Sequence, residues 1–156
     1  MPRLTTGLLV AAGLSIAATI PVASIAQSGS PAGVQTVSVG QPCAACHLPS
    51  GAGVPGAFPP LRANFVALAK LPEGRRYIVS VVTRGLSGAI AVDGKRFIGN
   101  MPAQALGDDQ IAKVLNGILG GAARPFTPRE VAALRTGAAK LGPNEVARLR
   151  PSGASR

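Results

Sequence analysis

The chain has 156 residues, a length that fits one domain with additional segments. Hydrophobic residues make up 47% of it and aromatic residues only 3%, so its core is short of large side chains. Lys and Arg outnumber Asp and Glu by 16 to 6, which gives a net charge of +10. The basic residues are scattered, without a dense run or interleaved aromatics, and this excludes the usual pattern of a nucleic-acid-binding module.

The N-terminal residues 1–26 have the three parts of a secretory signal peptide. A charged start with Arg3 precedes the apolar stretch 7–20, and small residues follow. The apolar stretch is shorter than the ~20 residues that span a bilayer, which favours cleavage over a membrane anchor. Cleavage after Ala26 leaves fifteen basic and six acidic residues, a net charge of +9. Residues 27–34 then form a linker of small residues. The expected location is periplasmic, with membrane association only if the segment is not cleaved.

The stretch CAACH, residues 43–47, holds both cysteines and the only histidine of the chain. A disulfide between Cys43 and Cys46 would close a very small loop and stabilise little. A thioredoxin-type pair needs a βαβ setting that the sequence lacks, and a structural zinc site needs a fourth ligand. The pattern C-x-x-C-H also attaches haem covalently, with the His binding iron. This interpretation uses all three residues, and a haem would fill a core that has few aromatics.

The segments that follow are predicted to be loops and helices. Residues 48–60 carry four Pro and three Gly and are predicted to be a loop. Residues 62–70 predict a short helix, and residues 73–85 predict a longer one with an apolar face made by Ile78, Val81 and Val82. The stretch 89–104 is expected to be irregular, with Asp93–Gly94 as a tight turn between short extended pieces.

Met101 lies in this stretch and is the only Met left after signal removal. A lone Met usually fills a core, but the surrounding sequence GNMPAQ is polar and rich in turn residues. Met101 is therefore a candidate for the second axial ligand of a haem iron. The stretch directly precedes a strong helix at 108–119, which begins with two acidic residues and ends before Gly120.

The C-terminal residues 122–156 predict further helices. Thr127 and Glu130 form a capping box, with a proline at the first helical position. The sequence PREVAALR, from residue 128, recurs as PNEVARLR, from residue 143, at six of eight places. The apolar stripe of this segment has to be buried against the preceding domain or against a partner subunit. The stripe consists of Val131, Leu134 and Leu141, and we expect it to be buried against a partner subunit.

In their residues and order, four stretches resemble class I c-type cytochromes of the small bacterial kind. They are CAACH, GAGVPGAFPPL (51–61), VDGKRFIGNMP (92–102) and DDQIAKVLNGIL (108–119). The resemblance covers residues 43–119, about half of the chain. It implies an all-α fold, in which a small helical domain (35–121) surrounds one covalently attached haem c with its iron, followed by a C-terminal helical extension (122–156).

This resemblance also assigns roles. Cys43 and Cys46 carry the thioether bonds, and His47 and Met101 bind the iron. The carbonyl of Pro59 accepts a hydrogen bond from the ligand His, with Pro60 as the alternative. Leu61 packs against the ring, and the candidates for contact with the haem propionates are Tyr77, Arg62, Arg75 and Arg76.

The sequence departs from the family pattern at both ends of the domain. Pro42 stands next to Cys43, which leaves only a short helix or an extended arm before the first cysteine. The family core normally ends near Gly120, whereas this chain continues for 35 more residues after Gly121.

The predicted function is one-electron transfer without substrate chemistry. The expected partner is an acidic redox protein, a dehydrogenase or a terminal oxidase, and the chain would be the electron-accepting partner or a subunit of the dehydrogenase. The alternative function is a haem-based sensor or small-ligand binder, which requires Met101 to be labile. A third interpretation is a haem-free module with a disulfide.

Overall fold

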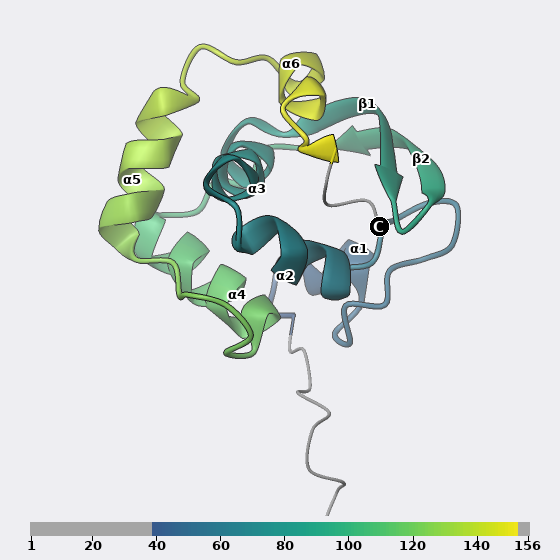
Figure 1. Cartoon of the computed structure of the whole chain (residues 1–156), viewed down its shortest axis with the longest axis horizontal. Coiled ribbons are helices and arrows are strands. Elements are labelled where there is room, and N and C mark those ends of the chain that lie inside the picture. The colour runs from purple at the N-terminus through teal and green to yellow at the C-terminus, as the bar shows by residue number, and fades with distance from the viewer. Residues whose placement is uncertain (1–38, 153–156) are drawn as a thin grey trace, which may run out of the picture. The chain divides into compact units, whose positions relative to one another are not determined.

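The computed structural model describes residues 39–152, so the predicted signal peptide (1–26) and linker (27–34) lie outside the described residues. In Figure 1, α3 lies near the centre, with the β-hairpin on one side of it and α5 on the other. No helix in the described part of the chain is long and apolar enough to cross a membrane. The elements are α1 (Ala44–His47), α2 (Ala63–Ala69), α3 (Pro72–Arg84), β1 (Leu86–Val92), β2 (Lys95–Met101), α4 (Asp108–Leu119), α5 (Pro128–Gly137) and α6 (Pro143–Arg148).

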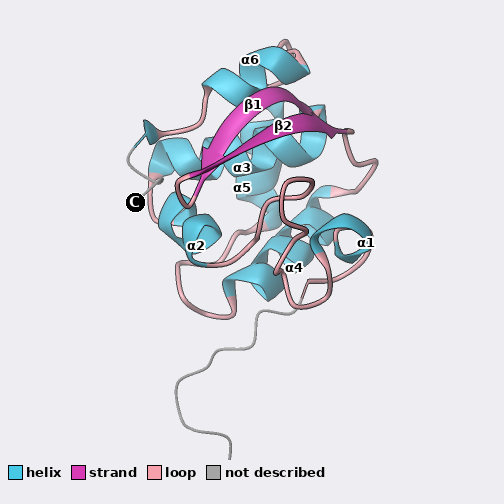
Figure 2. Ribbon diagram, turned by 90° about the vertical axis from the view of Figure 1, so that its right-hand side faces the viewer, coloured by secondary structure: helices cyan, strands magenta, loops and turns pink. Residues whose placement is uncertain are grey.

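The β-hairpin corrects the expectation of an all-α fold, and the stretch 89–104 is not irregular (Figure 2). β1 and β2 pair antiparallel over their full length, with Leu86 opposite Met101 and Val92 opposite Lys95. The predicted tight turn is confirmed, because Asp93 and Gly94 both adopt the left-handed φ values, 49° and 72°, that a two-residue hairpin turn requires. Glycines in both strands interrupt the alternation of apolar and polar residues, which hides the strands in the sequence.

The helices predicted at 62–70, 73–85 and 108–119 are confirmed, with ends that move by at most one residue. α3 begins at Pro72, ends before Gly85 and buries Tyr77, Ile78, Val79 and Val82. Its β-branched residues lower helix propensity, but packing on both sides compensates. α4 ends where Gly120 turns left-handed at a φ of 54°. Before Cys43, the described residues 39–43 form no helix.

The apolar stripe of the C-terminal extension is buried within the chain itself, so the expectation that it contacts a partner subunit is wrong. Val131 and Val146, which hold the same place in the two repeats, have no exposed surface. α5 packs on α3 and α4, and α6 packs on α3 and β1. Leu134 and Leu141 lie partly buried against the same core. Since each buried Val contributes roughly 2 kcal/mol, the extension is part of the core that it covers.

Arg75 of α3 fastens the extension to the core. Its side chain is buried and donates to both carboxylate oxygens of Glu130, at 2.6 and 2.7 Å. It also donates to the carbonyls of Arg124 and Pro125, and its guanidinium lies 3.7 Å from the centre of the Phe126 ring. The hydrogen bonds from Arg75, with further help from Arg124, hold the pKa of Glu130 at about 2, below its usual value near 4.5.

We expect Glu130→Gln to lower the free energy of unfolding by roughly 3 kcal/mol at pH 7, because it leaves the buried guanidinium without its anion. A depressed carboxyl pKa stabilises the fold above the unfolded value and loses that effect as the group becomes protonated. The difference between wild type and variant should therefore shrink as the pH falls from about 4.5 to about 2.

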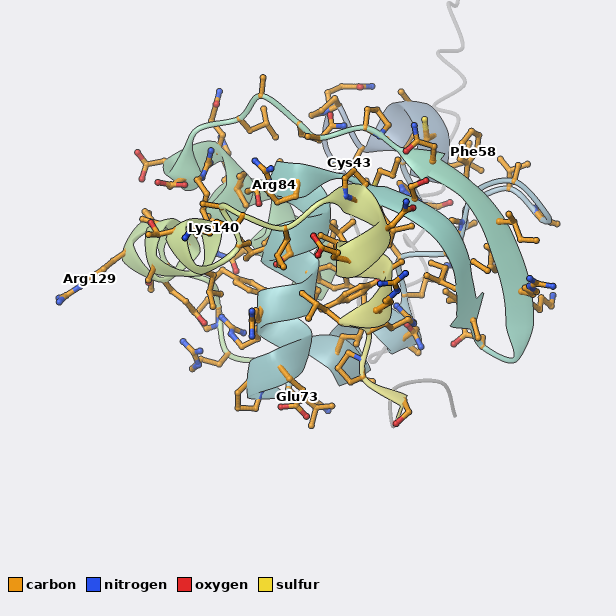
Figure 3. All side chains as sticks on the ribbon, turned by 90° about the horizontal axis from the view of Figure 1, so that it is seen from above. Cys43, Phe58, Glu73, Arg84, Arg129 and Lys140 are labelled. Carbon is orange, nitrogen blue, oxygen red and sulfur yellow. The ribbon has the colours of Figure 1, made fainter. Side chains whose placement is uncertain are left out.

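Chemical denaturation over this pH range measures the effect. Glu73→Gln is the matched control, since Glu73 is exposed at the outer end of α3 and takes part in no ion pair among the described residues (Figure 3). Equal losses of stability in the two variants, or a difference that does not depend on pH, would contradict the assigned role of the Arg75–Glu130 pair.

Candidate cofactor site

The short helix α1 brings Cys43, Cys46 and His47 to one cavity. The backbone N–H groups of Cys46 and His47 both donate to the carbonyl of Cys43, which winds the three residues into a single turn. Both cysteines are free thiols, Cys43 half-buried and Cys46 exposed. Burial is the main cause that raises the pKa of the Cys43 thiol. All three side chains line the cavity, so a group held by both sulfurs would lie beside the imidazole.

The His47 ring is fixed by one hydrogen bond. Its Nδ1 lies 2.8 Å from the carbonyl oxygen of Pro59, not of Pro60, and since a carbonyl can only accept, Nδ1 carries the proton. Burial lowers the pKa of the imidazole, and the bond to Pro59 opposes this in part. The ring is therefore neutral near pH 7, and the lone pair of Nε2 is available to bind a metal.

The loop after α1 is folded closely enough to hold Pro59 in place. Val54 pairs with Phe58 in a small bridge, and the N–H of Gly53 donates to the carbonyl of His47 at 3.0 Å. Gly53 has a φ of 66°, and a Cβ there would overlap the carbonyl oxygen of Phe58 and lie 2.8 Å from that of Pro59. Only glycine fits this position. Leu61, at the end of the loop, also lines the cavity.

The β-hairpin forms another wall of the cavity and places Met101 there. Because side chains alternate along a strand, the register that sets Leu86 opposite Met101 puts alternate residues from Leu86 to Val92 and from Phe97 to Met101 on the cavity face. These residues are Leu86, Gly88, Ile90, Val92, Phe97, Gly99 and Met101. Met101 thus ends a strand and does not lie in a loop. Gly85 fixes this end, since a Cβ there would lie 2.7 Å from the Met101 carbonyl oxygen.

The cavity has a volume of about 440 Å³ and an apolar interior, within the size range of cofactor and ligand sites. Its floor comes from three helices, through residues that include Leu68 of α2, Ile78 and Val82 of α3, and Leu115 and Ile118 of α4. Two thiols, a neutral imidazole and a thioether at the edge of such a space fit a flat apolar ring with a central iron. In the described residues no group of three or more His, Cys, Asp and Glu could hold a metal ion.

The residues proposed from the sequence for the haem propionates are only partly at this site. Tyr77 lines the cavity, but Arg75 is bound to Glu130, and Arg62 and Arg76 are exposed and do not line it. Sequence reasoning missed Arg150, which follows α6 and is the only Lys, Arg, Asp or Glu among the cavity-lining residues of the described chain. The only sequence feature that could have pointed to Arg150 is the recurring sequence PNEVARLR, which ends in this residue.

Comparison with known proteins agrees with this geometry. The sequence model of the family described as "Cytochrome c" matches residues 33–120, more than half of the chain. The chain is also 42% identical over 113 residues to "Cytochrome c-552" of Thermus thermophilus, a match that covers 67% of this chain and 85% of that protein. A second protein of the same name, from a named strain of the same species, matches with the same identity over 75% of its length.

The geometry and the matches agree. One turn carries two free thiols and a fixed imidazole, and an apolar cavity lies beside it. The chain belongs to the cytochrome c family as a class I c-type cytochrome, an electron-transfer protein and not an enzyme, with covalently bound haem c.

Proposed function

We propose that this protein is a one-electron carrier in which Cys43 and Cys46 hold the haem by thioether bonds and His47 and Met101 are its axial ligands. The observation that carries this proposal is that His47, from α1, and Met101, from the end of β2, line the same cavity. Figure 2 supports it by showing the hairpin on one side of the interior and α1 on another.

The side chains around the cavity have separate tasks. When bound, the haem supplies the iron that takes up and gives back one electron. Pro59 holds the His47 ring in one orientation and increases its basicity. Met101 supplies a sulfur ligand, which favours a raised reduction potential. The apolar floor excludes water, and with both axial positions occupied small molecules are kept from the iron.

The sensor alternative required Met101 to lie on a labile Gly-Asn loop. The strand pairing through Met101 and the contact of Gly85 with its backbone argue against such lability. After Met101, the N–H of Gln104 donates to the carbonyl of Val82 at 2.8 Å, which fastens the following segment to α3. These contacts support stable His/Met ligation and therefore electron transfer over ligand sensing.

We further propose that the protein is exported to the periplasm and exchanges electrons with an acidic redox protein, a dehydrogenase or a terminal oxidase. The signal-like residues 1–26 support export. The net charge of +9 that remains after removal of residues 1–26 supports an acidic partner. Arg129 extends away from α5, and Lys140 is exposed beyond it (Figure 3).

Met101→Ala tests the ligand assignment and the function together. The oxidised wild type should show the weak long-wavelength iron–sulfur charge-transfer band, and the reduced wild type should not bind carbon monoxide at neutral pH. The variant should lose the band and bind carbon monoxide. Ile98→Ala is the control, because Ile98 lies on the same strand but is 64% exposed. A band that survives in Met101→Ala would show that Met101 is not its source, and a wild type without the band would move the assignment to Lys95 or Asn100. Carbon monoxide binding by the wild type would favour the sensor.

Gly53→Ala should weaken the bond between His47 and Pro59, because its Cβ would displace the Pro59 carbonyl. A less basic imidazole stabilises the oxidised iron less, so the reduction potential should rise and the Nδ1 proton should exchange faster with solvent. Gly56→Ala is the matched control: its φ of 77° imposes the same backbone strain, but no atom lies within 4 Å of its Cβ. Equal potentials and exchange rates in the two variants would show that Gly53 does not support the ligand.

The positive surface should be visible in reactions with small oxidants. Oxidation of the reduced protein by ferricyanide, an anion, should slow as ionic strength rises from about 0.01 M to about 1 M, since the Debye length falls from ~30 to ~3 Å. Oxidation by a cationic cobalt(III) phenanthroline complex should become faster over the same range. Rates that do not change with salt for both reagents would leave the charge without a steering role.

A further inference from the structure

An arginine from the C-terminal extension reaches the haem cavity. Arg150 lies just after α6, far in sequence from the cytochrome stretch 43–119, yet it lines the cavity together with Asn64 of α2 and Tyr77 of α3. We call these three residues the Arg150 cluster. They bring polar groups to a wall of a cavity that is otherwise largely apolar.

The cluster is held in place by contacts to three elements. Nε of Arg150 donates to the carbonyl of Ala91 in β1 at 2.9 Å, and Nη2 donates to Oδ1 of Asn64. The guanidinium carbon lies 5.4 Å from the centre of the Tyr77 ring. Tyr77 and Asn64 are 4% and 5% exposed. Burial raises the pKa of Tyr77, and the charge and hydrogen bonding of Arg150 oppose this in part.

The first repeat shows what is missing around Arg150. Arg135 holds the same place in PREVAALR as Arg150 does in PNEVARLR, and each donates to a backbone carbonyl of the core, that of Leu106 and that of Ala91. Arg135 also has an anion, with its Nε 2.8 Å from the Asp108 carboxylate. None of the ion pairs among the described residues includes Arg150. Arg150 is only partly exposed, and a guanidinium partly removed from water gains from an anionic partner. The described residues that line the cavity include no Asp or Glu to provide one.

A c-type haem carries its own anions. Its two vinyl-derived carbons are bound to the cysteine sulfurs, and its two propionate carboxylates lie on the part of the ring away from those carbons. Arginine binds carboxylates through paired N–H groups, and the hydroxyl of Tyr77 and the amide of Asn64 can also donate to them.

From these observations we infer that the Arg150 cluster binds a haem propionate, so that the C-terminal extension completes the cofactor site. The inference rests on the thioether attachment at Cys43 and Cys46 proposed above. Tyr77 keeps the role expected from the sequence, and Arg150 takes the place of Arg62, Arg75 and Arg76. Because the guanidinium is positive in both redox states, it favours the reduced iron and balances the propionate charge.

Arg150→Gln, in the full-length holoprotein, tests this inference through the reduction potential and its dependence on pH. The potential at pH 7 should fall, since a positive charge near the iron is removed. The propionate should also become harder to ionise, so the step in potential that follows its titration should move up by about one pH unit or more. The other titratable residues that line the cavity should not produce this step. Cys43, Cys46 and His47 are held by the haem in the proposed function, and the pKa of Tyr77 is raised.

Arg148→Gln is the matched control, because Arg148 is exposed on α6 and its change removes the same charge. If Arg150→Gln shows only the potential and pH profile of Arg148→Gln, the inference is overturned, and Arg150 serves only to fasten the extension. A purely structural role would lower the denaturation midpoint without moving the pH profile.

Should Arg150→Gln not accumulate with haem, Arg150→Lys decides the matter. An ammonium keeps the charge but cannot reproduce the planar contact of a guanidinium, so the resonance Raman band of propionate bending should shift. An unshifted band would overturn the inference. Covalent haem content and the charge-transfer band of the wild type are measured in parallel, because their absence would refute the proposed function itself.

Discussion

The fold depends on a cavity that the protein's own side chains do not fill. Helices α2, α3 and α4, the turn of α1 and the β-hairpin all present apolar groups to this space of about 440 Å³. An apolar space of that size leaves its lining without contacts on one side, so the haem supplies packing as well as chemistry. This explains how a chain with 3% aromatic residues and no Trp forms a stable core. It also explains the hairpin, because two strands alone are at most marginally stable in water, and here their inner face packs against the cofactor space.

The C-terminal extension closes the other side of this arrangement. It buries Val131 and Val146 against the core and meets the buried Arg75 with a carboxylate from Glu130. The two repeats attach to the core in a similar way. Each has a buried valine and a terminal arginine that donates to a backbone carbonyl of the core. The first repeat, in α5, packs on α3 and α4, and the second, in α6, packs on α3 and β1. The extension therefore stabilises the elements that shape the cavity, and through Arg150 it reaches the cavity itself.

Electron transfer requires a site whose geometry changes little between the oxidised and reduced states, and the contacts described above restrict such changes. His47 is held by Pro59, Pro59 by the packing of Gly53, and the Met101 backbone by strand pairing and Gly85. Each of these contacts involves backbone, which moves less than a free side chain. Apart from Arg75, Arg135 and Arg150, the basic residues that the structure describes are exposed, so they affect encounter with a partner more than they affect the iron.

The sequence by itself determined the haem motif, the family, the long helices and the tight turn at Asp93–Gly94, because each depends on residues close together in the chain. Periodicity, caps and the C-x-x-C-H spacing are local patterns. The tertiary structure alone decided the rest. Glycines in both strands concealed the hairpin, and the place of Met101 on the cavity face follows from strand register, which is a pairing between segments. The apolar stripe in α5 and α6 showed that these helices bury one face, but it did not show which surface they pack against. The cavity position of Arg150 depends on contacts with residues 59 and 86 positions away in the chain, and no local pattern carries that information.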